Sequence, residues 1–224
     1  MLRVGLTGEL GSGKSTVARM LSERGALVLS SDEMGRALMQ PGQQVFAKIV
    51  AAFGRQVLSV DGTLDRKRLA VLAFDAQRPR VEELNAIIHP AVIEEQAIQM
   101  AELARAKPHA IVVVESALIF STQHGARGGW RSRFDKVLIV TAPDEVKMER
   151  FIARIAAERT LSAEERAALS ADAWRRLRIQ HQTPCPSDGI LLRNDGDVDA
   201  LERQVDVVWE QLLEMERQSE ESQA

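Results

Sequence analysis

Residues 4–15 have the sequence VGLTGELGSGKS, in which a short apolar run leads into a glycine-rich loop that ends in Lys14 and Ser15. The apolar run, residues 4–7, predicts a short buried β-strand. Residues 14–24 repeat apolar side chains at the spacing of one helix face. A strand, a glycine loop and a helix in this order predict the first unit of an α/β domain.

The loop fits the pattern G-x-x-x-x-G-K-[ST] at every fixed position. Its glycines let backbone N–H groups turn inward around phosphate oxygens, and the helix that follows points the positive end of its dipole at the same anion. Lys14 adds a cation for the β- and γ-phosphates of a nucleotide, and the Ser15 hydroxyl can ligate Mg²⁺. The predicted nucleotide-binding residues are Gly11, Ser12, Gly13, Lys14, Ser15 and Thr16.

An incidental glycine turn between a strand and a helix is the alternative to this phosphate-binding loop, or P-loop. The pattern alone occurs by chance, but here an apolar strand leads in and an amphipathic helix leads out, which favours nucleotide binding. The chain has no N-K-x-D sequence of the kind that recognises guanine, so we expect ATP rather than GTP.

Four further apolar runs predict strands that alternate with helices, at residues 26–29, 110–114, 136–140 and 190–192. This alternation predicts a three-layer α/β fold of the P-loop NTPase type, with a mainly parallel sheet covered by helices on both faces. We interpret residues 1–224 as a single domain of this kind. Residues 43–106 carry no strand pattern and predict an inserted helical region that binds the acceptor, and residues 154–180 predict a small lid.

Prolines set several of the expected helix boundaries. Residues 80–88 have a helical pattern, and Pro90 fits the first turn of a separate helix over residues 90–106. Pro143 is expected to open a helix that ends near residue 157. A polar, weakly amphipathic stretch follows, and the next helix is predicted over residues 173–182.

The composition limits the class of protein. The chain has 224 residues, 45% of them hydrophobic and 27% charged, which is ordinary for a soluble globular protein. Its single cysteine, Cys185, cannot form an internal disulfide, which fits a reducing compartment. The formal net charge of −3 lacks the basic excess of a general nucleic-acid binder, and no apolar run is long enough to span a membrane. We therefore expect a cytoplasmic protein without nucleic-acid or membrane partners, either a monomer or a weak homo-oligomer.

Two carboxylates follow predicted strands, so they should lie at the edge of the sheet where ligands bind. Asp32 follows the second strand and could accept the proton of an acceptor hydroxyl, or it could serve only as a helix N-cap or first-turn acid. Glu115 ends the third strand and could hold a Mg²⁺-bound water, or it could be a carboxylate in a strand-end turn. The residues alone leave both pairs of alternatives open.

Arg150 and Arg154 lie four residues apart and therefore share a helix face. Mobile arginines that close over a triphosphate are a common lid device, whereas a solvated basic face is the plainer interpretation. For Arg66 and His89, too, a role in a binding site has to be compared with a plain structural role. His89, which precedes Pro90, is by itself typical of a histidine at a helix entrance.

The motifs together resemble one family, the dephospho-CoA kinases. No single motif besides the P-loop is specific, but their order and spacing are. In chain order the resemblance rests on the P-loop, Asp32 with Arg36 ahead of Gln40-Pro41-Gly42, Phe53-Gly54, Asp61-Gly62-Thr63-Leu64-Asp65-Arg66, His89-Pro90, Arg150 with Arg154, and Asn194-Asp195-Gly196.

The resemblance implies transfer of the γ-phosphate of ATP to the ribose 3′-hydroxyl of dephospho-CoA, with Mg²⁺. It implies that Asp32 is the general base, beside Lys14 and Arg150 as catalytic residues, and that Arg154 binds ATP from the lid. The acceptor-binding residues that it implies are Asp32, Arg36, Arg66 and His89.

The sequence also departs from the family pattern. The family has D-x-D at the end of the second strand, and this chain has Ser30 in place of the first acid. The family has P-L-L-F-E after the third strand, and the corresponding stretch of this chain, residues 117–121, begins with Ala117 and has Ser121 in place of the glutamate. Glu9 stands where the family has glycine. These departures keep two alternatives open: a P-loop kinase for another nucleoside or nucleotide acceptor, and a protein that binds ATP without catalysing transfer.

Overall fold

The computed structural model describes residues 1–75, 77–117, 119–120, 129–180 and 188–221. Ser121, Cys185 and part of the helix predicted over residues 173–182 lie outside the described residues. None of the described helices is long and apolar enough to cross a membrane.

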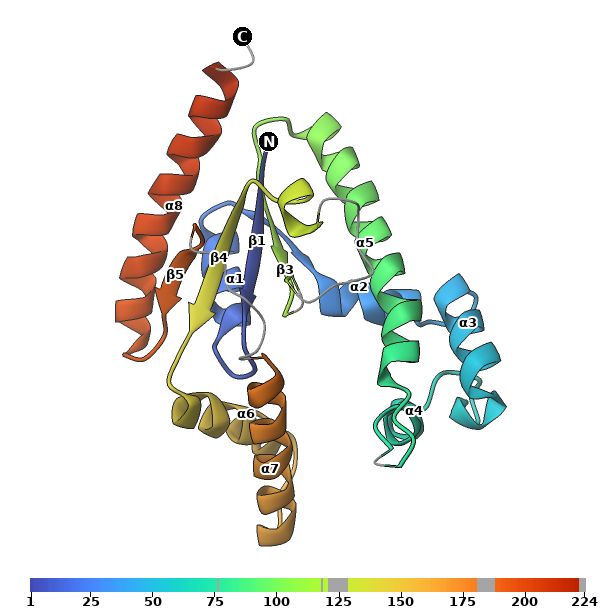
Figure 1. The fold of residues 1–224 in the computed structure, drawn as a ribbon. Coiled ribbons are helices and arrows are strands. Elements are labelled where there is room, and N and C mark those ends of the chain that lie inside the picture. The colour runs from blue at the N-terminus through green and yellow to red at the C-terminus, as the bar shows by residue number, and fades with distance from the viewer. Residues whose placement is uncertain (76, 118, 121–128, 181–187, 222–224) are drawn as a thin grey trace.

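A five-stranded parallel sheet forms the centre of the molecule (Figure 1), with the strand order β2-β3-β1-β4-β5. The strands are β1 (Leu2–Gly8), β2 (Leu27–Ser30), β3 (Ile111–Glu115), β4 (Lys136–Thr141) and β5 (Ile190–Arg193). The prediction of a mainly parallel α/β sheet is therefore confirmed. Because all strands run the same way, their carboxyl ends meet at one edge, which lies opposite the two chain ends in Figure 1.

Helices cover both faces of the sheet, which gives the three layers that the sequence predicts. On one face, α1 (Lys14–Glu23) and α8 (Val198–Glu221) share a buried core with the side chains of β1, β3 and β4. On the other face, Gly5 of β1 leaves room for Ile119 and Phe134, since a Cβ at Gly5 would lie 2.8 Å from the Ile119 side chain. Close packing on both faces makes the sheet a rigid base for the loops at its carboxyl edge.

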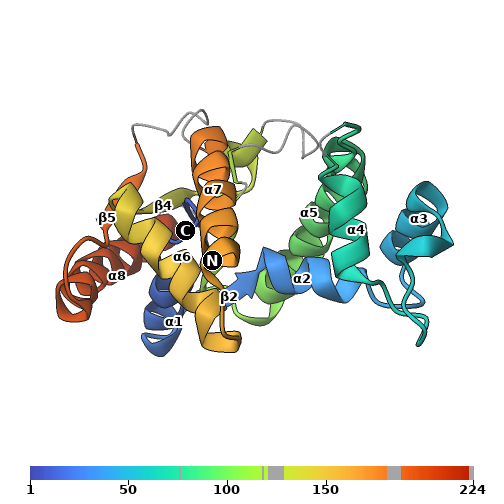
Figure 2. The ribbon, with the colours of Figure 1, turned by 90° about the horizontal axis from the view of Figure 1, so that it is seen from below.

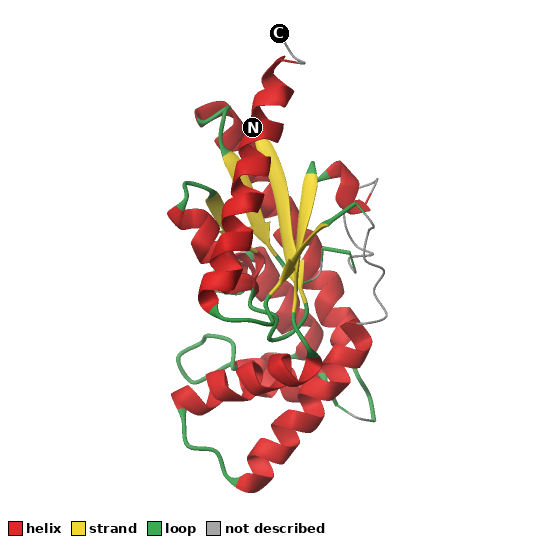
Figure 3. Cartoon of the chain, turned by 90° about the vertical axis from the view of Figure 1, so that its left-hand side faces the viewer, coloured by secondary structure: helices red, strands yellow, loops and turns green. Residues whose placement is uncertain are grey.

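The chain between β2 and β3 is helical wherever it forms regular structure. Its helices are α2 (Ser31–Leu38), α3 (Gln44–Phe53), the short 3-10 helix η1 (Arg55–Val57), α4 (Arg66–Ala73) and α5 (Val81–Ala106). α3, η1 and α4 bury a core of their own that includes Ile49 and Phe53, which packs against the first half of α5. Figure 3 shows that the region beyond the carboxyl ends of the strands is built of helices.

The two helices predicted on either side of Pro90 are one continuous helix, α5, so that prediction is wrong. A proline inside a helix removes one backbone hydrogen bond and disfavours helical geometry in the residue before it. Burial on both sides of Pro90 outweighs that loss. Ile88 packs against the α3–α4 core, while Val92 and Met100 are each 8% exposed.

The chain after β4 forms a helical hairpin of α6 (Asp144–Glu158) and α7 (Ala163–Gln180). The prediction that the second helix begins at residue 173 is wrong by ten residues, because a capping box starts α7 at Ala163. The Glu165 amide donates to the Ser162 hydroxyl at 3.1 Å, and the Ser162 amide donates back to the Glu165 carboxylate at 2.9 Å. Met148, Phe151 and Ala173 form the buried seam between the two helices.

The position of Pro90 inside α5 yields a stability prediction. An interior proline costs a helix about 3 kcal/mol, whereas its stiffening of the unfolded chain returns about 1 kcal/mol or less. We expect Pro90→Ala to raise the free energy of unfolding by about 1 to 2 kcal/mol, measured by urea unfolding followed by circular dichroism. Pro143→Ala is the matched control, because Pro143 lies at the N-cap of α6, where no hydrogen bond is lost. Equal or lower stability of Pro90→Ala would contradict this account of α5.

Candidate active site

The P-loop between β1 and α1 has room only for glycine at three positions, Gly8, Gly11 and Gly13. Gly11 has φ 72°, and a Cβ there would lie 2.1 Å from the backbone oxygen of Lys147. Gly13 has φ 97°, and a Cβ there would lie 2.1 Å from Nδ2 of Asn194. Both the backbone conformation and the close neighbours therefore require a residue without a side chain. At Gly11 and Gly13 the loop therefore passes directly against α6 and against the residue after β5.

Asn194, directly after β5, ties the loop to the far edge of the sheet. Its amide Nδ2 donates to the Ser12 backbone oxygen at 2.9 Å, and its own backbone N–H donates to Thr141 at 2.7 Å. Arg150 of α6 completes this connection by donating to the Asn194 backbone oxygen at 2.9 Å and to Oδ1 at 3.2 Å. The Arg150 side chain thus holds the loop through Asn194.

The Lys14 ammonium lies back over its own loop, where it donates to the backbone oxygens of Gly8 at 2.9 Å and Glu9 at 3.1 Å. Burial lowers the pKa of Lys14, and the negative charges of Glu115 and Asp32 oppose that shift. Burial also raises the pKa of Glu115, while Lys14 lowers it and Asp32 raises it. The cation and the two carboxylates therefore interact across the carboxyl edge of the sheet, as their positions after β1, β2 and β3 predict.

The tip of the P-loop is attached to the α6–α7 hairpin. The Lys147 ammonium, only 2% exposed, binds the Glu9 carboxylate and also lies 2.7 Å from Asp144. Burial alone would lower the pKa of Lys147, but the hydrogen bonds that its ammonium donates to Asp144 and Glu9, and their negative charges, outweigh burial, so the pKa is raised. The Leu10 amide donates to the Gln180 side chain at 2.9 Å. These contacts couple the position of the loop to that of the hairpin.

Arg154 of α6 is exposed and faces the same loop. Its guanidinium lies 5.8 Å from the centre of the Phe151 ring, and its positive charge contributes to the lowered pKa of Lys14. Arg150 and Arg154 are four residues apart, as the sequence predicts, yet Arg150 is held by Asn194 while Arg154 has its charge near Lys14.

Asp32 lies in the first turn of α2, but it does not cap that helix. The cap is Ser30, whose hydroxyl accepts a hydrogen bond from the Glu33 amide at 3.3 Å. The N-cap alternative for Asp32 is therefore excluded, while its position as a first-turn acid remains. The structure also gives Ser30, the departure from D-x-D, a role of its own.

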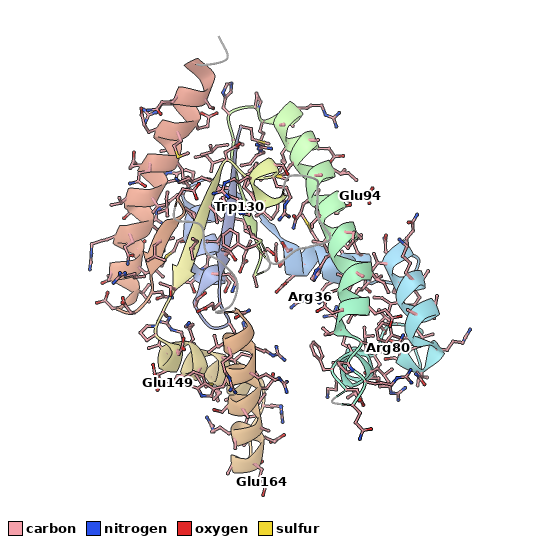
Figure 4. All side chains as sticks on the ribbon, viewed as in Figure 1. Arg36, Arg80, Glu94, Trp130, Glu149 and Glu164 are labelled. Carbon is pink, nitrogen blue, oxygen red and sulfur yellow. The ribbon has the colours of Figure 1, made fainter. Side chains whose placement is uncertain are left out.

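A cavity of about 550 Å³ opens beside Asp32, and it brings together residues that are far apart in the sequence. Asp32, Arg36, Arg66 and His89 all line it, from α2, α4 and α5. In Figure 4 the Arg36 side chain lies on α2, and Figure 2 views this edge of the molecule with α6 and α7 on one side and α2, α4 and α5 on the other. The P-loop residues, Arg150 and Arg154 are not part of its wall.

Sequence reasoning missed several residues of this wall, among them Ser31, Phe74, Gln96, Arg133 and Arg176. Arg176 belongs to a basic cluster on α7 with Arg175 and Arg178. The sequence shows this cluster but does not indicate which site it serves. Arg133 donates to the Ile119 backbone oxygen at 3.2 Å, and burial lowers its pKa. Nothing local in the sequence marks Gln96 or Arg133, because only the packing of α5 and of the residues before β4 brings them to the cavity.

Comparisons with known proteins agree on one family. The profile of the family described as dephospho-CoA kinase matches residues 2–183 of this chain. The dephospho-CoA kinase of Moorella thermoacetica is 37% identical over 212 residues, which cover 95% of this chain and 92% of the relative. That of Thermobifida fusca is 38% identical over 213 residues, which cover 95% of this chain and 96% of the relative.

A solved structure has a similar fold over nearly the whole chain. The crystal structure of TT1252 from Thermus thermophilus has a TM-score of 0.62 and 29% identity, and the match covers 94% of this chain and 97% of that chain. The P-loop, the parallel sheet and these comparisons lead to the same conclusion: this chain belongs to the dephospho-CoA kinase family.

Proposed function

We propose that this protein transfers the γ-phosphate of ATP to the ribose 3′-hydroxyl of dephospho-CoA, which yields coenzyme A and ADP. The observation that carries the proposal is the cavity at the start of α2, in whose wall one carboxylate, Asp32, lies among the cationic side chains of Arg36 and Arg66. Phosphoryl transfer needs an oriented acceptor, a group that takes its proton, and cations around the transferred phosphate.

In this proposal, ATP occupies the P-loop. The backbone of Gly11, Ser12, Gly13 and Thr16 surrounds its phosphates at the N-terminus of α1. Lys14 exchanges its two backbone carbonyl partners for the β- and γ-phosphates, whose negative charge favours the ammonium form. Arg154, near Lys14, adds positive charge from the lid side, and Arg150 acts by holding the loop through Asn194.

The acceptor occupies the cavity. Asp32 accepts the proton of the ribose 3′-hydroxyl while the 3′-oxygen attacks the γ-phosphorus. The bond from that phosphorus to the β,γ-bridging oxygen breaks, and ADP leaves. Arg36, Arg66 and His89 bind the remainder of dephospho-CoA, whose pyrophosphate is a suitable partner for guanidinium groups. A neutral acceptor would gain little from so many cations.

The residues at this edge also fit Mg²⁺. This ion takes few protein ligands and completes its shell with water and substrate phosphates. The described residues hold no cluster of three or more His, Cys, Asp or Glu side chains suited to a metal, so the ion would enter with the nucleotide. We propose that the Ser15 hydroxyl binds it and that Glu115 holds one of its waters. When bound, it neutralises charge on the phosphates.

We further propose that the molecule works as one domain of residues 1–224, with residues 43–106 as the acceptor-binding insertion and residues 154–180 as a lid that closes over the two substrates. The hairpin of α6 and α7 supports this proposal, because it touches the P-loop at Glu9 and Leu10 and carries Arg176 to the acceptor cavity. We expect the protein to act in the cytoplasm, as a monomer or a weak homo-oligomer.

The direct test is ADP release from Mg·ATP with purified protein. Dephospho-CoA is the acceptor, and AMP and adenosine are the controls. We expect ADP release that depends on dephospho-CoA, with formation of coenzyme A in equal amount. Turnover with AMP or adenosine instead would indicate a P-loop kinase for another acceptor. ATP binding without release of ADP for any of the three would indicate a non-catalytic protein.

We expect Lys14→Ala to lower kcat by about a hundredfold or more, because it removes a cation that stabilises charge in the transition state. Steady-state kinetics with ATP and dephospho-CoA measure this. Lys48→Ala is the matched control, since Lys48 is an exposed lysine on α3. If Lys14→Ala kept near-normal kcat, the assignment of the P-loop as the phosphate site would be wrong.

We expect Asp32→Asn to lower kcat by about a hundredfold or more while the KM for ATP changes little, because the variant keeps the size of the side chain and loses the proton acceptor. Glu33→Gln is the control, because Glu33 is also an acid in the first turn of α2. Unchanged kcat for Asp32→Asn would show that Asp32 is not the general base and only interacts favourably with the dipole of α2 as a first-turn acid.

A further inference from the structure

One polar pair in the acceptor cavity has no part in the mechanism above. Gln96 of α5 is 3% exposed, and its side-chain Nε2 donates to the Ser31 hydroxyl at 2.7 Å. Both residues line the cavity, and Ser31 directly precedes Asp32 at the start of α2. The pair therefore joins α5 to the residue next to the proposed general base.

The Gln96 amide is only partly satisfied. Its Oε1 is buried and has no hydrogen-bond partner among the described residues. The opposite orientation of the amide would be worse, because it would leave an NH₂ group with two unused donors in the same place. Buried polar groups are nearly always paired, so an amide that keeps one atom unpaired at the wall of a cavity indicates a role for the bond that it does make.

That bond fixes how the Ser31 hydroxyl can be used. A serine hydroxyl has one hydrogen and two lone pairs. Gln96 donates to one lone pair, so the hydrogen is not spent on this contact and can be donated elsewhere. Among the described residues Ser31 makes no other side-chain hydrogen bond, and its half-buried side chain lies in the cavity wall. The Ser31 hydroxyl is thereby left able to donate a hydrogen bond to a molecule bound in the cavity.

We propose that Ser31 binds the 2′-hydroxyl of the acceptor ribose and that Gln96 is a positioning residue that orients the Ser31 hydroxyl. The inference rests on the proposed function, in which Asp32 takes the 3′-hydroxyl. Ser31 and Asp32 are consecutive, with α-carbons about 3.8 Å apart, and both line the cavity. The 2′- and 3′-hydroxyls lie on neighbouring carbons on the same side of a ribose ring, so two consecutive side chains match two consecutive hydroxyls.

The adenine amino group is another polar group of the acceptor that could meet this pair. It lies at the far end of the base from the 3′-hydroxyl, whereas Ser31 is the immediate neighbour of Asp32. The 2′-hydroxyl is therefore the better match, and the site is predicted to distinguish ribose from 2′-deoxyribose. A 2′-hydroxyl can donate as well as accept, which suits contact with a serine hydroxyl.

The test measures kcat/KM for dephospho-CoA and for its 2′-deoxy analogue in wild-type protein and in Ser31→Ala. We expect wild type to prefer the ribose acceptor by about tenfold, the value of one good neutral hydrogen bond. Ser31→Ala should lose that preference, because it weakens turnover of dephospho-CoA and leaves turnover of the 2′-deoxy analogue unchanged. The comparison isolates the contact between one side chain and one hydroxyl.

Two further variants separate positioning from folding. Gln96→Met should reduce the preference for ribose with little change in the KM for ATP, while Gln99→Met, on the same helix with its amide bonded to Glu95 at 2.7 Å, should leave the preference intact. Ser31→Thr keeps a hydroxyl and should retain the preference.

The failures are distinguishable. Absence of ADP release with dephospho-CoA in wild type would overturn the proposed function itself. Normal turnover of dephospho-CoA with no preference for ribose in wild type, or an equal loss for both acceptors in Ser31→Ala, would overturn the inference about Ser31 and leave the proposed function standing.

Discussion

The absence of room for side chains in the loop after β1 is the constraint on which the rest of the site depends. Gly11 passes against the backbone of Lys147 in α6, and Gly13 passes against the Asn194 side chain after β5. These contacts exist only because a parallel sheet brings the carboxyl ends of β1, β4 and β5 to one edge. The phosphate-binding loop is therefore shaped by two segments far from it in the sequence, and its backbone N–H groups are held ready for an anion before any nucleotide arrives.

The features that the sequence predicts well are those whose physical cause is local. The five strands and the P-loop follow from short apolar runs and from one glycine pattern. The predicted helix break at Pro90 is absent because the free energy that proline costs the helix is smaller than the free energy gained by burial on both sides of it. The start of α7 lies earlier than predicted because Ser162 and Glu165 form a cap there. The residues of the cavity wall are not predictable in this way, because no local pattern marks them. Nothing local in the sequence distinguishes Gln96 or Arg133, because they reach the cavity only when α5 packs on α2 and the residues before β4 fold against the same wall.

The loop tip explains one departure from the family pattern. Glu9 stands where the family has glycine, and its carboxylate binds the buried Lys147 ammonium. A buried ammonium without a partner would be strongly destabilising, so Glu9 and Asp144 together make a charged lysine tolerable beneath the loop. The departure thus adds a tie between the P-loop and the α6–α7 hairpin, beside the contact of Leu10 with Gln180. These two contacts tie the position of the P-loop to that of the hairpin.

Ser30, Ser31 and Asp32, at the end of β2 and the start of α2, each have a different role. Ser30 caps α2 and pairs in register with Glu115 of β3. A carboxylate in place of Ser30 would therefore stand next to Glu115, whose pKa is already raised by burial and by the charges of Asp32 and Glu33. A third negative charge would raise that pKa further and favour the neutral form of Glu115. With serine at this position, Glu115 ionises more readily, and Asp32 is the one acid of the D-x-D pattern that this chain keeps. The loss of the first acid of D-x-D is thus compatible with the mechanism that we propose, in which Glu115 holds a metal-bound water and Asp32 accepts the proton.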